Sequence, residues 1–272
     1  MNICELFRAR KKMDLHDADA ASKPLASAGK TNDKSEDKLQ VVRLAERIAG
    51  YQDVFYAARE RKLLVVLQGM DTAGKDGAVR GVFGLIDPLG IRGVAFKTPT
   101  ENEREHDYLW RVHKEVPGQG EIVIFNRSHY EDVLISRVHG WIDEKECQRR
   151  YAQIRDFERM LAESGTVLLK FFLHISKEEQ KQRLEERISD PDKHWKFDPK
   201  DLAERQYWAE YQQAYQQAIQ ETNVDHAPWY VIPANSKTHR NLAIASILVE
   251  VLEKMQLTYP PANPDYVKMK VV

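Results

Sequence analysis

The sequence predicts an α/β fold, a three-layer sandwich in which a central parallel sheet of five strands lies between helices. Short apolar runs alternate with longer amphipathic segments along most of the chain, and this alternation is typical of a parallel sheet with helices on both faces. The run Thr166–Ile175 is nearly continuous in apolar residues, as expected for a strand that is buried on both faces. The glycine-rich turn Gly69–Lys75 follows the first apolar run and precedes a helical pattern, so a ligand-binding loop is expected where that strand ends.

Each predicted strand is a short run rich in valine, isoleucine, leucine and aromatic residues. In chain order these strands are Leu63–Gln68, Val94–Lys97, Glu121–Asn126, Thr166–Ile175 and Trp229–Ile232. Glycine or proline punctuates several of their ends: Pro99 follows the second strand, and the turn 117–120 precedes the third. Such residues favour turns, so these runs are bounded as separate strands.

Each predicted helix has apolar residues three or four positions apart. In chain order these helices cover about 39–51, 76–86, 100–116, 144–163, a segment that starts at 176, 201–222 and 241–255. Capping boxes at Thr100–Glu103 and Ser176–Glu179 open two of them, and Gly165 ends the helix before the fourth strand. The polar stretch Ser189–Lys200 predicts a loop.

The chain divides into three parts of different composition. Residues 1–35 are polar with few large apolar side chains after Leu15, so we expect a flexible N-terminal arm. Residues 36–258 contain all predicted strands and form one domain, and the proline-rich residues 259–272 form a C-terminal tail. Within the domain, we expect residues 183–210 to form a helical lid.

Composition argues against several classes of protein. The net charge is −1, so an overall basic surface for duplex nucleic acid is not expected. The two cysteines, Cys4 and Cys147, form no CxxC pair, which fits a reducing cytoplasm and gives no disulfide or zinc framework. No apolar run approaches the roughly 18 residues that indicate a membrane-spanning helix. We therefore expect a cytoplasmic protein that binds neither nucleic acid nor membranes.

The loop Gly69–Asp76 has the GxxxxGK spacing of a phosphate-binding loop. In such a loop, backbone N–H groups surround the phosphates, the helix N-terminus adds its dipole, and the lysine, here Lys75, adds a point charge. Two carboxylates depart from the common pattern, because Asp71 lies inside the loop and Asp76 stands where a Ser or Thr usually holds magnesium. Carboxylates beside phosphate require cations between them, so we expect Mg²⁺, or Mn²⁺ in its place, at Asp71. The predicted phosphate-binding residues of the loop also include Gly69, Met70, Thr72, Ala73, Gly74 and Asp76.

A second group of polar residues leaves the carboxyl end of the third predicted strand, at Asn126–Asp132. In phosphate-loop proteins a neighbouring strand supplies the second metal-organising group at this place. We expect Arg127 to bind phosphate through its forked guanidinium. Asp132 is expected to bind magnesium or to orient the acceptor. Asn126 is neutral where an aspartate is usual, so it is assigned to positioning.

Two residues of this second group have alternative interpretations. Glu131 either binds metal or acceptor, or completes a capping box with Ser128. His129 lies two residues after Arg127. It either contacts phosphate or is a structural histidine. Both alternatives stay open from the sequence, and both residues are kept as candidates for the nucleotide and phosphate site.

The third group surrounds the polar stretch Ser189–Lys200. Its basic members are Arg183, Arg187, Lys193, Lys196 and Arg205. Cations on a polar segment between helices suit a lid that closes over phosphates and excludes water. Arg187 is the best candidate because it lies at the junction of helix and loop, and Lys196 and Arg205 are further phosphate-binding candidates. The alternative is a solvated surface, because carboxylates are interleaved with these cations.

Two of these stretches resemble the signature motifs of the polyphosphate kinase 2 family. They are Gly69–Gly77, with the sequence GMDTAGKDG, and Phe125–Val133, with the sequence FNRSHYEDV. The segment His106–His113, and Asp190-Pro191 followed by Trp195-Lys196, are similar to that family as well. The resemblance spans about residues 39–255.

The resemblance implies a Mg²⁺-dependent transferase that uses inorganic polyphosphate and a nucleotide and assembles as a dimer or tetramer. By matching position it makes Asp71 a metal and acceptor-side group, Lys75 and Arg127 phosphate-binding groups, and Arg187 a lid cation. Some subgroups of the family carry an aspartate before the arginine of the second motif. This chain has Asn126 there, and that version resembles the subgroups that phosphorylate AMP, or both AMP and ADP.

The expected reaction moves the terminal phosphoryl group of polyphosphate to a phosphate oxygen of AMP or ADP, so that ADP or ATP is formed. It is reversible, since one phosphoanhydride bond is broken and another is made, and its catalysis is mainly positioning and charge neutralisation. Two alternatives stay open. A nucleoside monophosphate kinase would take its phosphoryl group from ATP, and a non-catalytic switch would bind nucleotide without turnover.

Overall fold

The computed structural model describes residues 2–26, 34–266 and 269 of the chain. Its centre is a sheet of five parallel strands in the order β2-β3-β1-β4-β5. The strand bounds are Lys62–Gln68 (β1), Ile91–Ala95 (β2), Ile122–Asn126 (β3), Thr166–His174 (β4) and Trp229–Pro233 (β5). The predicted α/β class and the predicted sheet are therefore confirmed, although β2 begins and ends earlier than the predicted second strand.

The register of the sheet brings two of the predicted motifs together. The central strand β1 lies between β3 and β4, and its residues from Leu63 to Gln68 are buried. Leu67 lies opposite Asn126 of β3 and Phe171 of β4. Because the strands are parallel, the segments that follow β1 and β3 leave the same edge of the sheet. The glycine-rich loop and the segment after Asn126 are therefore neighbours.

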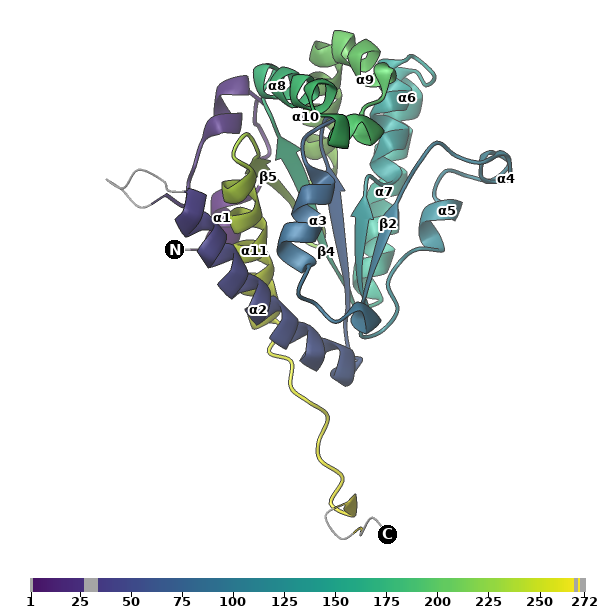
Figure 1. The fold of residues 1–272 in the computed structure, drawn as a ribbon. Coiled ribbons are helices and arrows are strands. Elements are labelled where there is room, and N and C mark those ends of the chain that lie inside the picture. Colours follow the sequence, from purple (N-terminus) through teal and green to yellow (C-terminus); the bar gives the residue numbers. More distant parts are fainter. Residues whose placement is uncertain (1, 27–33, 267–268, 270–272) are drawn as a thin grey trace.

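Helices cover both faces of the sheet, and α2, α3 and α11 pack against one another on one face while α7 and α10 pack together on the other (Figure 1). The three-layer arrangement is thus confirmed. The helix bounds are Ile3–Phe7 (α1), Lys34–Ala58 (α2), Lys75–Phe83 (α3), Glu101–Arg104 (α4), Trp110–His113 (α5), Ile135–Val138 (α6), Glu144–Glu163 (α7), Lys177–Ser189 (α8), Pro199–Glu204 (α9), Trp208–Thr222 (α10) and Lys237–Lys254 (α11). The 3-10 turns are Asp17–Ala21 (η1), Pro88–Gly90 (η2), His129–Val133 (η3), Pro191–Lys196 (η4) and Arg205–Tyr207 (η5).

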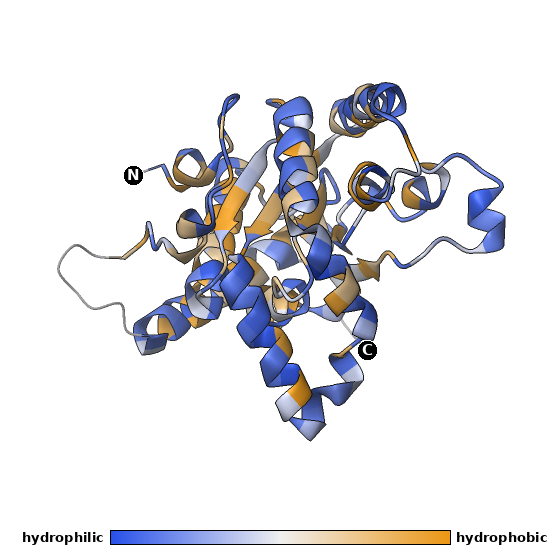
Figure 2. Ribbon diagram, turned by 90° about the horizontal axis from the view of Figure 1, so that it is seen from above, coloured by the Kyte–Doolittle hydropathy of each residue, from blue (hydrophilic) through white to orange (hydrophobic). Residues whose placement is uncertain are grey.

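A continuous apolar core lies between these layers. Seen from above, the central strands carry mainly hydrophobic residues and the outer helices carry many hydrophilic ones (Figure 2). Val65 and Phe172 in the sheet, Ile154 on α7 and Ile244 on α11 are all completely buried, and burying a side chain of this size contributes about 1.5–3 kcal/mol. Within the part of the chain that the structure describes, no helix has both the length and the apolar character needed to cross a membrane.

Two predicted helices are interrupted. The capping box at Thr100 is confirmed, but the helix it opens ends at Arg104, because the Asp107 carboxylate accepts the backbone N–H of Leu109 and forms a local turn. The predicted loop and helix over 189–222 instead contain η4, α9, η5 and α10. Asp198 caps α9 and Pro199 occupies its first turn, which is a strong local start signal within the predicted loop.

The expectation of a flexible arm over residues 1–35 is wrong for residues 2–26. Cys4, Phe7 and Ala9 are buried in the core cluster. The backbone N–H of Ala9 donates to the carbonyl of Trp229 at 2.8 Å, and Arg8 forms an antiparallel bridge with Tyr230. A few apolar side chains and backbone hydrogen bonds thus hold this polar segment against the core of the domain. Residues 27–33 of the predicted arm lie outside the described residues.

The C-terminal segment leaves the body after α11. Residues 259–266 are exposed and extend away from the sheet (Figure 1). The hydroxyl of Tyr259 donates a hydrogen bond to the carboxylate of Asp53 on α2. This contact ties the start of the segment to the helical layer.

Candidate active site

The glycine-rich loop joins the end of β1 to the start of α3. Gly74 has a φ of 97° and precedes the first residue of α3. A Cβ on Gly69 would lie 2.8 Å from the carbonyl oxygen of Leu173, so a side chain does not fit there. The ammonium of Lys75 folds back and donates to the carbonyl of Gly69 at 2.6 Å. The N-terminus of α3 therefore opens directly onto the loop, as an anion site requires.

Burial makes the charge of Lys75 sensitive to its surroundings. The residue is 8% exposed, and burial, together with the nearby charge of Arg127, lowers its pKa to about 8, while Asp71 and Asp76 act in the opposite direction. An anion bound at the loop would favour the ammonium form. The protein itself thus only partly stabilises the charged form of Lys75.

Arg127 and Asn126 connect the end of β3 to the loop. The guanidinium of Arg127 donates to Asp71 Oδ1 at 2.8 Å, and the amide of Asn126 donates to Asp76 Oδ1 at 2.6 Å. Burial acts to lower the pKa of Arg127, but Glu131 and Asp71 together hold that pKa above its usual value. The two motifs meet through direct side-chain contacts, which agrees with the positioning role predicted for Asn126.

Arg183 of α8 anchors the base of the predicted lid. Its guanidinium is 5% exposed and donates to the carbonyls of Thr72 and Ala73 in the loop at 2.8 and 3.1 Å. It also donates to the carbonyls of Ala234 and Asn235, which follow β5, at 2.6 and 3.0 Å. Arg183 therefore fastens the loop, α8 and the end of β5 to one another, and it belongs to the rigid part of the site.

Arg187 lies one turn further along α8 and faces the segment η4–α9. Its guanidinium donates to the carbonyl of Lys196 at 3.0 Å and forms an ion pair with Asp201 at 3.3 Å. Burial, and then the charge of Asp71, raise the pKa of Asp201 to about 6, while Arg187 acts to lower it. The charge of Asp71 therefore acts on Asp201 across the site, and Asp201 belongs to α9, one of the helices at the top of Figure 1.

These groups line one cavity of about 670 Å³ at the carboxyl edge of the sheet. Basic side chains outnumber carboxylates in its lining by about two to one. The basic residues are Lys75, Arg80, Lys97, Arg127, Arg183, Arg187, Lys193, Lys196, Lys237 and Arg240, and the acidic residues are Asp71, Asp76, Glu186, Asp198 and Asp201. The structure thus brings together the predicted Asp71, Thr72, Gly74, Lys75, Asp76, Asn126, Arg127, Arg187 and Lys196. A chain of phosphates is the kind of ligand that such a surface suits.

Other predicted site residues lie away from the cavity wall. His129 is completely buried, and its ring nitrogen faces the carboxylate of Glu158 at 3.3 Å; the expectation that His129 contacts phosphate is therefore corrected in favour of the structural alternative. Arg205 donates to the carbonyl of Lys177 and to Gln180 on α8. Its guanidinium supports α8 and does not face the phosphate cavity.

Asp132 is surrounded by arginines. Its carboxylate lies 3.8 Å from the guanidinium of Arg111 and 4.0 Å from that of Arg150. Burial raises its pKa to about 6, although both arginines act to lower it. The structure does not bring Asp132 into the cavity that Asp71 lines. Glu131 does not line that cavity either, although its charge acts on Arg127 and Lys75.

Sequence reasoning missed four cations of the cavity, Arg80, Lys97, Lys237 and Arg240. Arg240 is the most informative because it is 2% exposed and its guanidinium donates to the carbonyl of Ala73 and to Asn241. Burial, and then Arg183, lower its pKa to about 9. A signal was present in the sequence: Arg240 lies in the first turn of the helix after the fifth strand, and parallel topology places that turn at the ligand edge.

The donor set around Asp71 fits a divalent cation that is shared with phosphate. Mg²⁺ is usually held by one or two carboxylates together with substrate phosphates and water. The Asp71 side chain is 25% exposed, and the buried hydroxyl oxygen of Thr72 in the same loop has no hydrogen-bond partner among the described residues. Within residues 2–26, 34–266 and 269, no three His, Cys, Asp or Glu side chains converge as a metal cage. The phosphates would therefore complete the coordination.

Comparison with known proteins identifies the family of this chain. The family model described as Polyphosphate kinase 2 matches residues 31–260. The chain belongs to the polyphosphate kinase 2 family. It is accordingly an enzyme, a phosphotransferase, and the resemblance found in the sequence is confirmed.

Several known proteins are similar to this chain over most of their length. An AMP/ADP-polyphosphate phosphotransferase of Meiothermus ruber is 53% identical over 229 residues, which are 84% of this chain and 85% of that protein. An ADP-polyphosphate phosphotransferase of Rhodopseudomonas palustris is 41% identical over 231 residues, 80% of each chain. The crystal structure of polyphosphate kinase 2 from Arthrobacter aurescens TC1 has a TM-score of 0.90 and 44% sequence identity, and the match covers 97% of this chain and 93% of that one.

Proposed function

We propose that this family member transfers the terminal phosphoryl group of inorganic polyphosphate to AMP, ADP or both, in a reversible reaction. The observation that carries the proposal is the basic cavity, in which cations from the glycine-rich loop, the end of β3, α8 and α11 surround the loop carboxylates Asp71 and Asp76. A linear polyanion without a base needs such a surface and no sequence-specific contacts. The names of the relatives from Meiothermus ruber and Rhodopseudomonas palustris agree with this chemistry.

The proposed roles follow from position in the cavity. Lys75, Arg127 and Arg187 neutralise charge on the phosphoryl group in transit, and the loop amides of residues 69–76 hold the neighbouring phosphates. Lys196 extends this surface on the lid. Members of this family use a divalent metal ion, and we propose that the ion is Mg²⁺, or Mn²⁺ in its place, held by Asp71. When bound, that ion neutralises phosphate oxygens beside the carboxylate.

A single assay tests the donor. The enzyme is incubated with AMP, long-chain polyphosphate and MgCl₂ without ATP, and the nucleotides are separated by chromatography. We expect ADP first and ATP later, with a parallel reaction from ADP. A control with AMP and ATP but no polyphosphate separates this reaction from that of an ATP-dependent monophosphate kinase.

Three outcomes decide between the candidate functions. ADP formed only with polyphosphate supports the proposal. ADP formed only when ATP is the donor favours the monophosphate kinase. Nucleotide binding by calorimetry with no product from either donor favours the non-catalytic switch.

Three further features belong to the same proposal. We propose that residues 184–210 close over bound polyphosphate while Arg183 keeps the base of α8 fixed.

We propose that the protein forms a homodimer or homotetramer, as the family resemblance implies. Multi-angle light scattering of the purified protein measures the number of subunits. The two cysteines are free and buried, which supports the cytoplasm as the compartment.

A further inference from the structure

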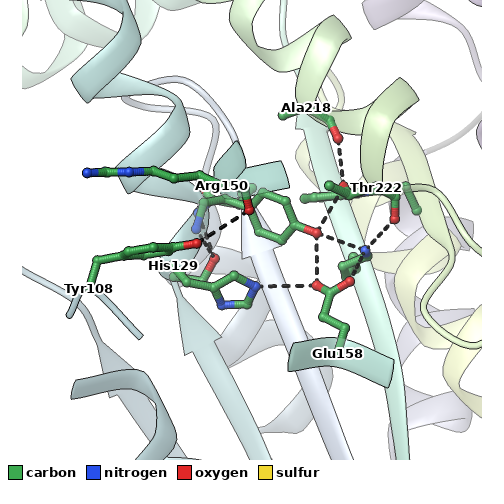
Figure 3. A network of polar contacts seen from close by, with 11 residues as sticks. Tyr108, His129, Arg150, Glu158, Ala218 and Thr222 are labelled. Atoms are coloured by element: carbon green, nitrogen blue, oxygen red, sulfur yellow. Dashed lines mark hydrogen bonds and ion pairs between the residues drawn. The ribbon is translucent and has the colours of Figure 1, made fainter. Parts of the chain in front are cut away.

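A buried polar network lies directly behind the second motif. Lys170 of β4 and Glu158 of α7 form an ion pair at 2.6 Å, and both side chains are completely buried. Tyr130 of η3, also completely buried, lies against both of them: its hydroxyl donates to Glu158 Oε1 at 2.8 Å and accepts from Lys170 Nζ at 2.8 Å. Figure 3 shows the Glu158 carboxylate at the centre of this network, with His129 on one side and Thr222 on the other.

Nearly every donor in this network has an acceptor. The Lys170 ammonium donates to Glu158, to Tyr130 and to the carbonyl of Thr222 at 2.9 Å, which uses all three of its protons. The Thr222 hydroxyl donates to the carbonyl of Ala218 and accepts from the indole N–H of Trp229. Burial acts to raise the pKa of Glu158, but Lys170 and His129 hold it below its usual value. Burial lowers the pKa of Lys170, and Glu158 acts to raise it. Three short contacts from the Lys170 ammonium fix the geometry of the pair.

The network connects η3, which follows Arg127, to the end of α10. On one side it holds η3, in which Tyr130 comes three positions after Arg127. Between these two residues, the hydroxyl of Ser128 accepts a hydrogen bond from the Gln68 amide of β1 at 3.1 Å. On the other side it holds Thr222, the last residue of α10. Helix α10 also carries the buried Tyr215, whose pKa is raised by burial and then by the charges of Glu131 and Asp71.

Arg127 needs such support because its backbone has a φ of 63°. A non-glycine residue in this region persists only where the surrounding structure holds it. A buried ion pair is often no more stable than a well-packed apolar pair of similar volume, so stability alone gives no reason for charges at this place. The directional contacts that these polar groups make from β4, α7 and α10 onto η3 do give a reason for their presence.

We propose that Tyr130, Lys170 and Glu158 are positioning residues, which hold the η3 turn against α10 and thereby fix Arg127 for phosphoryl transfer. This inference rests on the proposed polyphosphate transfer for its kinetic test. None of the three side chains lines the cavity, so they act through Arg127 and not by touching substrate.

The first test uses Tyr130→Phe, which removes one hydroxyl and keeps the ring. At a temperature well below unfolding, we expect kcat to fall about tenfold while KM for polyphosphate changes less than twofold, because orientation and not binding is altered. In an Arg127→Ala background the same change should lower kcat less than twofold. Tyr151→Phe is the matched control, since Tyr151 is an equally buried tyrosine of α7 outside the network.

The second test separates positioning from folding. The double variant Glu158→Gln with Lys170→Met removes both charges together, and we expect it to fold cooperatively but to show the same loss of kcat. Full activity in this variant, or additive losses for Tyr130→Phe and Arg127→Ala, would overturn the inference.

The third test does not depend on the substrate. Hydrogen exchange should become faster at residues 128–133 and at the end of α10 in Tyr130→Phe, and stay unchanged in α3 and in Tyr151→Phe. If the wild-type enzyme shows no transfer activity, the proposed function is wrong. The exchange pattern alone then tests whether the network holds the η3 turn. Unchanged exchange at η3 would count against the network in either case.

Discussion

Arg127 and Asp71 form an ion pair across 2.8 Å that joins the segment after β3 to the glycine-rich loop after β1. The arginine is 42% and the aspartate 25% exposed in their side chains, so both are open to the cavity. An exposed pair of this kind contributes little to stability. Each partner is instead available to a charge of opposite sign, Arg127 to phosphate and Asp71 to a metal ion.

Asp71→Asn should abolish most of the activity without unfolding the protein. The change keeps the size of the side chain and removes the charge that the metal ion requires, so we expect kcat to fall about 10²–10³-fold and the Mg²⁺ concentration for half-maximal rate to rise. Asp87→Asn makes the same chemical change at an exposed turn outside the cavity and should behave as wild type. Initial rates across a Mg²⁺ titration measure both effects. Wild-type rates in Asp71→Asn would remove the proposed metal site.

The kcat/KM for polyphosphate should decrease as the pH rises through about 8. The folded pKa of Lys75 lies near 8, below the 10.5 of an ordinary lysine, so the free enzyme loses this cation at a lower pH than a solvated lysine would. The pH dependence of kcat/KM reports such free-enzyme groups. Lys145→Ala, an exposed change on α7, should keep the decrease, and Lys75→Arg should remove it. A flat wild-type profile up to pH 10 would contradict the assignment.

Arg187→Ala should weaken polyphosphate binding and its dependence on salt. Each phosphate contact that a cation makes adds to the slope of log kcat/KM against log salt, by about 0.7 for a flexible polyanion. We expect a several-fold rise in KM and a slope that is smaller by about that amount. Arg43→Ala, on the exposed face of α2, should leave the slope as it is. An unchanged slope for Arg187→Ala would place this residue outside the polyphosphate path.

Asp132→Asn should change how stability depends on pH. The folded pKa of Asp132 is about 6, and the ordinary value is 3.8, so between these values the folded state binds a proton that the unfolded chain does not. This group therefore stabilises the folded state more as the pH falls from about 7 to 4. The free energy of unfolding of wild type relative to Asp132→Asn should rise on the order of 2 kcal/mol over that range. Urea titrations at pH 4.5 and 7 measure it, and a constant difference would refute the shift.

The sequence was most informative where function depends on a local pattern. The spacing of Gly69, Gly74 and Lys75 predicts the loop because backbone geometry and charge are set within a few residues. The pairing of Arg127 with the loop was also accessible, since parallel strands release their following segments at one edge of the sheet. Arg187 also lines the cavity, and the sequence pointed to it because it lies at the junction of a helix and a polar loop rich in cations.

Features that depend on distant partners were not accessible. Nothing near Arg183 in the sequence shows that its guanidinium reaches four backbone carbonyls of the loop and of the segment after β5. His129 was ambiguous because its partner Glu158 lies on another helix. Lys170 did offer a signal, since a lysine inside an otherwise apolar strand needs an interior partner, but the identity of that partner depends on packing.

The N-terminal segment has a consequence for how the protein is handled. Strand β5 is the last in the sheet, and its outer row of backbone groups is met by Arg8 and Ala9. An uncovered edge of this kind is a template for pairing with other chains. A truncated protein that starts near Lys34 would keep every cavity residue but expose this edge, so we expect it to self-associate more readily than the full chain.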